Sequence, residues 1–381
     1  MQSVSSTNPE ASRVCDRPEP RWNAENRTEN PFADHRFLSA LEACECIGPE
    51  TGWTSTVIET ASGDSFAPAW LKHHSHGEFV FDFAWAQAAH HAGLDWYPKL
   101  LVAVPLTPVT GPRLLGGSSG TRRELIGCFE ERVERDGLSS CAVNFCDRTD
   151  RAELESSDWL ARSDWQFHWF NHDYRDFDAF LGTMRSKPRK NIRRERRMAH
   201  EDGWSYRWVD GTEIRDSELD TVHACYRTTF LRYRNLPALT REFFERVARS
   251  FGTQFLVCFA SQHGQDLACG VFWRNRETLF GRYWGSLVET RDVHFETCYY
   301  QGIEYCIENE LARFEPGAQG EHKIRRGFLP VRTWSYHYIR HRGLREGIRR
   351  WLEMEHAALE DYRRQLRDLE PFRDEDDFRE S

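Results

Sequence analysis

The chain has 381 residues, an apolar fraction of 39%, an aromatic fraction of 13% and a formal net charge of −9. This length accommodates two domains of ordinary size, and this apolar content excludes a chain without packed cores. The negative charge excludes a nucleic-acid binder that depends on overall positive charge, although it allows a local basic groove.

Neither a membrane span nor a disulfide framework is expected. No run of about 18 apolar residues occurs. The polar leader, residues 1–32, lacks the apolar stretch of a signal peptide and is expected to be disordered. The 11 cysteines contain no CxxC pair, which fits reduced, buried thiols. His73, His74 and His76 lack a recurring metal-ligand spacing. We therefore expect a cytoplasmic protein without a metal site.

Residues 33–175 are predicted to form a first mixed α/β domain. Helices are expected at 36–43, 122–136 and 150–159, and strands at 52–59, 78–85, 99–104, 141–145 and 166–170. The run at 78–85, EFVFDFAW, is predicted to be a strand because its apolar residues alternate, or else an extended segment with one solvated face. The interleaving of strands and helices is typical of an α/β domain with a mixed sheet.

Residues 176–343 are predicted to form a second such domain, followed by a C-terminal helix and acidic tail at 344–381. Helices are expected at 176–203 with a break at Pro188, and at 216–233, 241–250, 295–310 and 344–369. Strands are expected at 254–260, 268–273, 278–285, 313–315 and 333–339. Both halves have a similar order of elements, so the sequence predicts a duplicated α/β unit, although no residue-level repeat is visible.

The segment 314–328, FEPGAQGEHKIRRGF, is the hardest to explain as scaffold. Its three glycines and one proline predict an irregular loop. Its polar side chains include Glu315, Gln319, Glu321, His322, Lys323, Arg325 and Arg326. So many ionisable groups are more typical of a site than of a connector. A solvated charged turn is the alternative.

A second unusual segment is 185–197, RSKPRKNIRRERR, with eight basic residues and Glu195 as its one acid. Helical spacing places Arg189, Arg193 and Arg196 or Arg197 near one face, where like charges destabilise a helix. An anionic ligand such as a phosphate would offset this repulsion. The alternative is a solvated face paired with acidic neighbours.

The aromatic strand at 279–285, LFGRYWG, is the third candidate segment. Gly281 and Gly285 inside a strand indicate a bulge or a close backbone approach. Arg282 lies between them, and Tyr299 and Tyr300 on the following helix are candidate proton donors.

Several segments resemble a known family. Residues 184–204 resemble the basic segment that opens the second acyltransferase unit of Fem-type peptidyl transferases. The pattern Lys-x-x-x-Gly-Phe at 323–328 resembles a recurring loop of that group. The longer segments HSHGEFVFDFAWA, YPKLLVAVPLTPVTGPRLL and FEPGAQGEHKIRRGF resemble the FemAB-like predicted N-acyltransferases, over about residues 33–370.

The resemblance implies two GNAT-type acyltransferase folds in tandem. It also implies transfer of an aminoacyl group from aminoacyl-tRNA, or of an acyl group from acyl-CoA, to an amine. The usual GNAT pyrophosphate loop is not evident before residues 297–310, which favours aminoacyl-tRNA. We expect no cofactor beyond this co-substrate.

Acyl transfer requires a deprotonated nucleophile, a stabilised oxyanion and a protonated leaving group. We expect Glu315 or Glu321 to act as general base, with His322 as the alternative. Donor contacts are expected from the basic side chains Arg189, Lys190, Arg193, Arg282, Lys323 and Arg326. Lys323 and Arg326 are also candidates to stabilise the oxyanion.

The alternatives are an acyl-CoA-dependent N-acetyltransferase and a non-catalytic protein that binds tRNA or another anionic polymer. A cysteine nucleophile is disfavoured, because no cysteine has a histidine at a recognisable spacing. The acceptor, an amine or hydroxylamine of a small molecule or a peptide, stays open, as do the acyl group and the oligomeric state.

Overall fold

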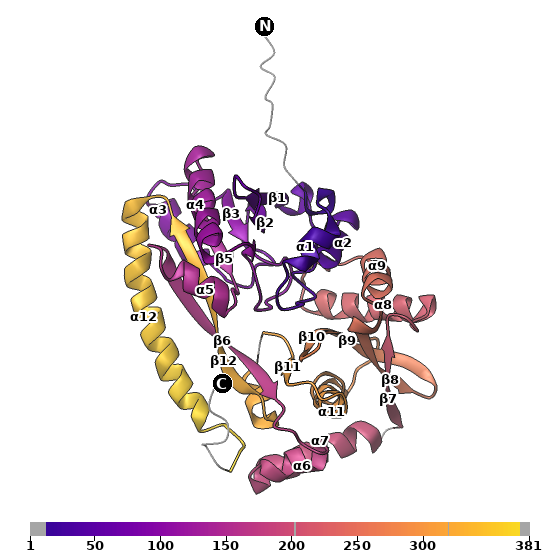
Figure 1. Cartoon of the computed structure of the whole chain (residues 1–381). Coiled ribbons are helices and arrows are strands. Elements are labelled where there is room, and N and C mark those ends of the chain that lie inside the picture. Colours follow the sequence, from indigo (N-terminus) through magenta and orange to yellow (C-terminus); the bar gives the residue numbers. More distant parts are fainter. Residues whose placement is uncertain (1–12, 202, 319, 374–381) are drawn as a thin grey trace. The chain divides into compact units, whose positions relative to one another are not determined.

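The computed structural model describes residues 13–201, 203–318 and 320–373, which fall into two compact units (Figure 1). The first unit comprises the chain up to Arg162 together with Trp334–Met354, and the second comprises Ser163–Thr333 and the residues from Glu355 onward. The chain therefore passes between units inside β6 (Leu160–Phe170), β12 (Leu329–Ile339) and α12 (Arg342–Arg367). Continuous strands and a continuous helix carry no loop signal, so sequence boundaries at 175 and 343 do not coincide with this division.

The first unit is built on a mixed sheet with the strand order β1, β2, β3, β5, β12. Its first strands are β1 (Trp53–Glu59), β2 (Ser65–Lys72) and β3 (Lys99–Val102), which pair in antiparallel fashion. Strand β5 (Ser140–Asn144) is parallel to β3 and antiparallel to β12, and the two-residue β4 (Leu115–Gly116) pairs with β2. The short helices of this unit are α1 (Glu19–Ala24), α2 (His35–Ala43) and α5 (Arg148–Leu154).

Helix α4 (Ser119–Arg135) covers part of the hydrophobic core of this sheet. Its apolar residues recur three or four positions apart, and Leu125, Phe129 and Val133 are buried among residues of β2, β3 and β5. The Ser118 side chain accepts a hydrogen bond from the Thr121 amide and so caps the helix at its start. The predicted helix at 122–136 is therefore confirmed, with an earlier first turn.

The predicted strand at 78–85 is wrong. Aromatic residues do alternate with other residues in this run, but its acidic residues are buried and its first two phenylalanines are exposed. Glu78 and Asp82 are buried against Lys99, with carboxylate oxygens 2.7 and 2.5 Å from Nζ. Phe79 and Phe81 are exposed, and the last three residues of the pattern belong to helix α3 (Phe83–His91). The two acidic side chains are buried here because they form ion pairs with Lys99, and the phenylalanines between them face solvent. Strand β2 was not predicted, because it is buried along most of its length and its sequence lacks alternation.

The second unit contains a mixed sheet with the order β6, β11, β10, β9, β8, β7. Its strands are β7 (Trp204–Asp210), β8 (Phe255–Gln262), β9 (Gln265–Arg274), β10 (Thr278–Ser286) and β11 (Arg313–Glu315), besides β6. All neighbours are antiparallel except β10 and β11, which are parallel. The predicted meander of three strands is thus confirmed as β8, β9 and β10.

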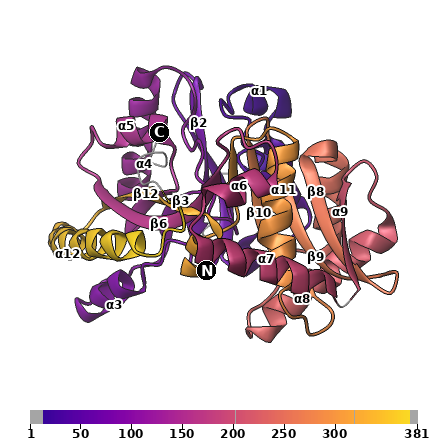
Figure 2. The same ribbon diagram turned by 90° about the horizontal axis from the view of Figure 1, so that it is seen from below.

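Helices α8 (Asp216–Arg232), α9 (Arg241–Phe251) and α11 (Gln301–Glu308) pack on this sheet, with α11 beside β10 and α9 beside β8 (Figure 2). The predicted helical region at 176–203 consists of α6 (Phe177–Thr183) and α7 (Ser186–Glu201). The break lies at Met184 and not at Pro188. Pro188 falls in the first turn of α7, where a missing backbone N–H costs nothing because that group has no partner within the helix.

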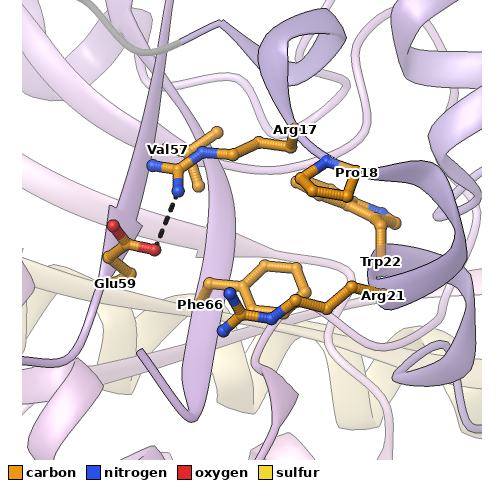
Figure 3. A pocket seen from close by; sticks show the side chains of 7 residues that line it. All are labelled: Arg17, Pro18, Arg21, Trp22, Val57, Glu59 and Phe66. Carbon is orange, nitrogen blue, oxygen red and sulfur yellow. Dashed lines mark hydrogen bonds and ion pairs between the residues drawn. The ribbon is translucent and has the colours of Figure 1, made fainter. Parts of the chain in front are cut away.

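A small pocket in the first unit is lined by residues of α1, β1 and β2 and of the turn before α1: Arg17, Pro18, Arg21, Trp22, Val57, Glu59 and Phe66 (Figure 3). Arg17 Nη1 lies 2.9 Å from Glu59 Oε2, and the Arg21 guanidinium lies over the Phe66 ring. Both arginines thus already have partners within the protein. Among the described residues, no helix is both long and apolar enough to cross a membrane.

Candidate active site

The loop at 314–328 begins where two parallel strands part. Pairing between β10 and β11 runs from Thr278 opposite Arg313 to Phe280 opposite Glu315. A bulge between Gly281 and Tyr283 then shifts the register of β10 against β9. An added Cβ at Gly285 would collide with the Cys225 carbonyl oxygen of α8, so this glycine permits a close backbone approach. Both glycine expectations are confirmed.

Within the loop, residues Glu321–Arg326 form a 3-10 helix, η5, so the expectation of a wholly irregular segment is corrected. This helix ends at Gly327, whose φ of 94° suits glycine. An added Cβ there would also press on the Phe180 ring. The 3-10 turn directs Lys323 and Arg326, three residues apart, toward the interior.

Lys323 is buried, with 2% of its surface exposed. Its Nζ donates a 2.6 Å hydrogen bond to the Gly317 carbonyl oxygen. Burial, with a further contribution from the positive charge of Arg282, lowers the pKa of the Lys323 ammonium to about 7. Both protonation states of this lysine are therefore available at neutral pH, which is the property a proton-transferring group needs.

Glu315, at the end of β11, is equally buried and lies between two arginines. Its Oε2 is 3.8 Å from Arg282 Nη2, and its Oε1 is 3.2 Å from Arg313 Nη2. Neither carboxylate oxygen accepts a hydrogen bond from the described residues. A buried carboxylate that retains accepting capacity is suited to a substrate N–H.

His168 on β6 lies in the candidate site and was not among the residues predicted from the sequence. Burial lowers the pKa of its imidazole to about 4, although the nearby Glu315 carboxylate acts in the opposite direction. Its Nε2 lies 3.3 Å from the Gln166 side-chain oxygen, while its buried Nδ1 has no hydrogen-bond partner among the described residues. The signal was present, since Gln166 and His168 alternate along one face of a strand.

Tyr299 and His322 form a second polar pair, with 3.0 Å between the Tyr299 hydroxyl and His322 Nε2. Burial raises the pKa of the Tyr299 phenol and lowers that of the His322 imidazole. Tyr299 lies in the π-helical turn Glu296–Tyr300, which precedes α11. Such a turn changes the angular position of its side chains relative to a regular helix.

Arg326 is held entirely by protein groups. Its guanidinium donates to both carboxylate oxygens of Glu195, at 3.1 and 2.9 Å, to the Tyr300 hydroxyl at 3.0 Å and to the His322 carbonyl oxygen at 2.7 Å. It also lies 3.6 Å from the Phe295 ring centroid. These contacts indicate that Arg326 fixes the loop against α7.

The two candidate general bases lie in different surroundings. Glu321 is exposed, and its Oε1 accepts a 2.7 Å hydrogen bond from the Tyr362 hydroxyl of α12. Glu315 lies in the buried group with Arg282 and His168. The structure therefore brings Glu315, Arg282 and Lys323 together, and it places Glu321 outside this group.

The basic helix α7 has two kinds of cation. Arg193, Arg196 and Arg197 form ion pairs with Asp178, with Glu296 and Glu304, and with Glu201. The other five basic side chains of the segment 185–197 have no ion pair among the described residues: Lys187, Arg189, Lys190 and Arg194 of α7, and Arg185, which precedes it. Of the expected donor contacts on α7, Arg189 and Lys190 retain their full hydrogen-bonding capacity, while Arg193 is engaged.

No group of three or more His, Cys, Asp or Glu side chains suited to a metal ion occurs in the described part of the chain. The described cysteines are all free thiols. Burial raises the pKa of Cys298, which is near Lys323, well above its usual range. This thiol therefore stays protonated and is a poor nucleophile.

Comparison with known proteins gives a family match over nearly the whole chain. The FemAB-like family model, described as peptidoglycan biosynthesis/recognition, matches residues 14–374. No curated protein matches the sequence significantly.

Among solved structures, FemX matches with a TM-score of 0.53 and 12% identity, covering 87% of this chain and 98% of its own. The C-terminal domain of a putative lysylphosphatidylglycerol synthetase from Agrobacterium fabrum matches with a TM-score of 0.55 and 10% identity, covering 84% and 91%. A tandem GNAT protein from the clavulanic acid biosynthesis pathway matches with a TM-score of 0.37 and 12% identity, covering 81% and 96%. The α/β fold class with mixed sheets, expected from the sequence, is confirmed, and the two structures with TM-scores above 0.5 share this fold. The division into tandem GNAT-type units stays a prediction.

Proposed function

Because the chain belongs to the FemAB-like family, we propose that it transfers an aminoacyl group from aminoacyl-tRNA to an amine or hydroxylamine nitrogen of a small-molecule or peptide acceptor. The observation that carries the proposal is a buried group beside the point where β10 and β11 part. In it, Arg282 lies near both the Lys323 ammonium, whose pKa is about 7, and the buried Glu315 carboxylate. Family membership supports a transferase connected with peptidoglycan.

In the proposed reaction Glu315 acts as general base. Its unoccupied oxygens accept a proton from the acceptor nitrogen, directly or through one water, as that nitrogen attacks the ester carbonyl carbon of the donor. The guanidinium groups of Arg282 and Arg313 place positive charge beside this carboxylate. His168, neutral because of its burial, adds no competing charge.

Lys323 stabilises the negative charge that develops on the carbonyl oxygen. When the tetrahedral intermediate collapses, the bond between the carbonyl carbon and the tRNA ribose oxygen breaks. Lys323 then gives its proton to that oxygen. The amide product and the free 3′ end of the tRNA leave, and transfer of the proton from Glu315 to Lys323 through solvent restores the starting state.

The unpaired cations of α7 supply the contact with donor phosphates. Arg189 and Lys190 are separated from the acids that neutralise Arg196, so their charge is available to an anionic ligand. In this proposal Arg326, Tyr300 and Glu195 hold the loop in position and do not contact the donor.

The test is to incubate the purified full chain with labelled aminoacyl-tRNA or labelled acyl-CoA, together with amine acceptors that include peptidoglycan stem peptides. We expect labelled amide from aminoacyl-tRNA, and less of it by about a hundredfold or more when Lys323→Met replaces the wild type. Amide formation from acyl-CoA alone would favour the N-acetyltransferase alternative. Binding of tRNA without discharge of any donor would favour the non-catalytic alternative.

A further inference from the structure

The last two turns of α8 and the residues that follow them expose large apolar side chains to solvent. Leu231, Tyr233 and Leu236 are 55%, 71% and 89% exposed, and Leu236 is the most exposed large apolar residue of the described chain. Single exposed apolar residues are common on protein surfaces, but three within six residues form a local patch. We call residues 227–236 the arginine–leucine turn.

The same turn is positively charged. Arg227, Arg232 and Arg234 are exposed, and none has an ion pair or a side-chain hydrogen bond among the described residues. Between Asp220 and Glu242 the sequence contains no acid. The apolar tips are therefore surrounded by uncompensated positive charge.

The backbone holds this turn in a defined shape. The Asn235 amide donates to the Phe230 carbonyl oxygen at 2.9 Å, and Arg234 has a φ of 55°, as in a helix C-terminal cap. The buried Tyr226 hydroxyl accepts hydrogen bonds from the Ala238 and Leu239 amides. Arginine in the left-handed conformation is unfavourable compared with glycine or asparagine. A role of the Arg234 side chain in binding would explain why arginine occupies this position.

We propose that the arginine–leucine turn docks the protein on the surface of an anionic phospholipid bilayer. Leucine and tyrosine tips gain free energy from entering the interface between headgroups and acyl chains, while arginines gain from anionic headgroups. The phosphates of a nucleic acid would pair with the arginines, and its bases could stack on Tyr233. A nucleic acid would not bury the apolar side chains of Leu231 and Leu236. A partner of mixed apolar and anionic character fits both halves of the turn.

The test measures partition of the full chain onto lipid vesicles by co-sedimentation, with phosphatidylcholine alone or with about a third phosphatidylglycerol. Wild-type protein is expected to bind the anionic vesicles and to bind the neutral ones far more weakly. Replacing all three arginines (Arg227→Gln, Arg232→Gln, Arg234→Gln) should weaken binding roughly a hundredfold at low salt, because each basic residue near the surface contributes about fivefold.

A second variant removes the apolar tips (Leu231→Ser, Tyr233→Ser, Leu236→Ser) and should also lose binding at low salt. The single change Leu236→Ser guards against misfolding, because this side chain has almost no contacts to lose. The matched control is Arg189→Gln with Lys190→Gln on α7, which should retain vesicle binding.

The proposal is overturned if the wild type does not bind anionic vesicles, or if the apolar variant binds them as well as the wild type. It is also overturned if the α7 control alone loses binding, or if the turn variants lose binding to tRNA while vesicle binding is unchanged. Failure of vesicle binding with intact aminoacyl transfer to a water-soluble acceptor would leave the proposed function standing.

Discussion

Arg326 and Glu195 join the 3-10 turn of the candidate site to the basic helix through two parallel hydrogen bonds of 2.9 and 3.1 Å. The Tyr300 hydroxyl contacts both side chains. Glu195 is the one acid among eight basic residues in the segment 185–197. Its position explains this isolation, since it neutralises a charge that comes from another part of the chain.

Breaking this pair should destabilise the second unit. In Glu195→Gln the largely buried guanidinium loses its countercharge, and such a loss costs about 3 kcal/mol. The control Arg197→Gln breaks an exposed pair with Glu201 and should cost less than about 0.5 kcal/mol. Urea unfolding of both variants and of Arg326→Gln measures these costs. A double-mutant cycle between Glu195 and Arg326 that shows no coupling would contradict this account.

Replacing Lys323 should separate activity from stability. Lys323→Met removes the group proposed to stabilise the oxyanion, so transfer should fall by about a hundredfold or more. The same change should raise the melting temperature at pH 7. Burial holds the folded-state pKa near 7, below the usual value of 10.5, so a charged lysine opposes folding by an amount on the order of 4 kcal/mol.

The pH dependence of this gain follows from the sign of the shift. The wild-type penalty is complete below pH 7, decreases as the pH rises, and disappears above about 10.5, where both the folded and the unfolded lysine are neutral. The stabilisation by Lys323→Met should therefore be larger at about pH 6.5 than at about pH 9.5, as measured by thermal unfolding. A gain that does not change with pH would show that the lysine is not buried in its charged form.

Sequence reasoning found the fold class and the family, and it singled out the segment that contributes most of the candidate site, because each depends on local pattern. The family resemblance is confirmed by the match over residues 14–374. The glycines at 281 and 285 were informative since a missing side chain has a geometric consequence at that very position. The predicted site residues Arg282, Glu315 and Lys323 converge because the loop and the bulged strand are neighbours.

What the sequence could not provide was the partner of each charge. Arg326 and Arg193 looked equivalent to Arg189, but Glu195 and Asp178 occupy them, and those contacts depend on tertiary packing. Glu315 and Glu321 were equal candidates on composition alone, although one is buried and the other faces Tyr362. The inverted pattern at 78–85 misled for the same reason, since Lys99 is distant in sequence.

The two acids of the loop provide a matched pair of substitutions. Glu315→Gln keeps the shape of the side chain but removes the proton acceptor, so kcat should fall by a factor of about 100 to 10,000. Glu321→Gln weakens one exposed hydrogen bond and should change kcat by no more than about twofold. Steady-state transfer assays on both variants test the assignment. A larger effect from Glu321→Gln would move the general base to the outer face of the loop.

The cations of α7 should act on donor binding and not on chemistry. Arg189→Gln with Lys190→Gln should raise KM for aminoacyl-tRNA while kcat stays near the wild-type value. The dependence of log affinity on log salt should also become shallower by about 1.5, as two phosphate contacts are lost. Arg197→Gln is the control, because Glu201 already neutralises that charge. Equal effects of the two changes would indicate a non-specific response to charge.

In the first unit, Lys99 should be essential for stability. Lys99→Met leaves Glu78 and Asp82 buried without a countercharge, which costs about 3–5 kcal/mol. Burial already raises the pKa of Glu78 in the wild type, and loss of the lysine raises it further. A carboxyl group whose folded-state pKa is raised contributes stability at low pH and loses it as the pH rises. The free energy of unfolding of the variant should therefore be lowered less at about pH 5 than at about pH 8.

Adding Glu78→Gln and Asp82→Asn to Lys99→Met should recover much of the lost stability, and thermal unfolding measures both effects. No recovery would show that the lysine stabilises the unit through packing of its aliphatic stem and not through its charge.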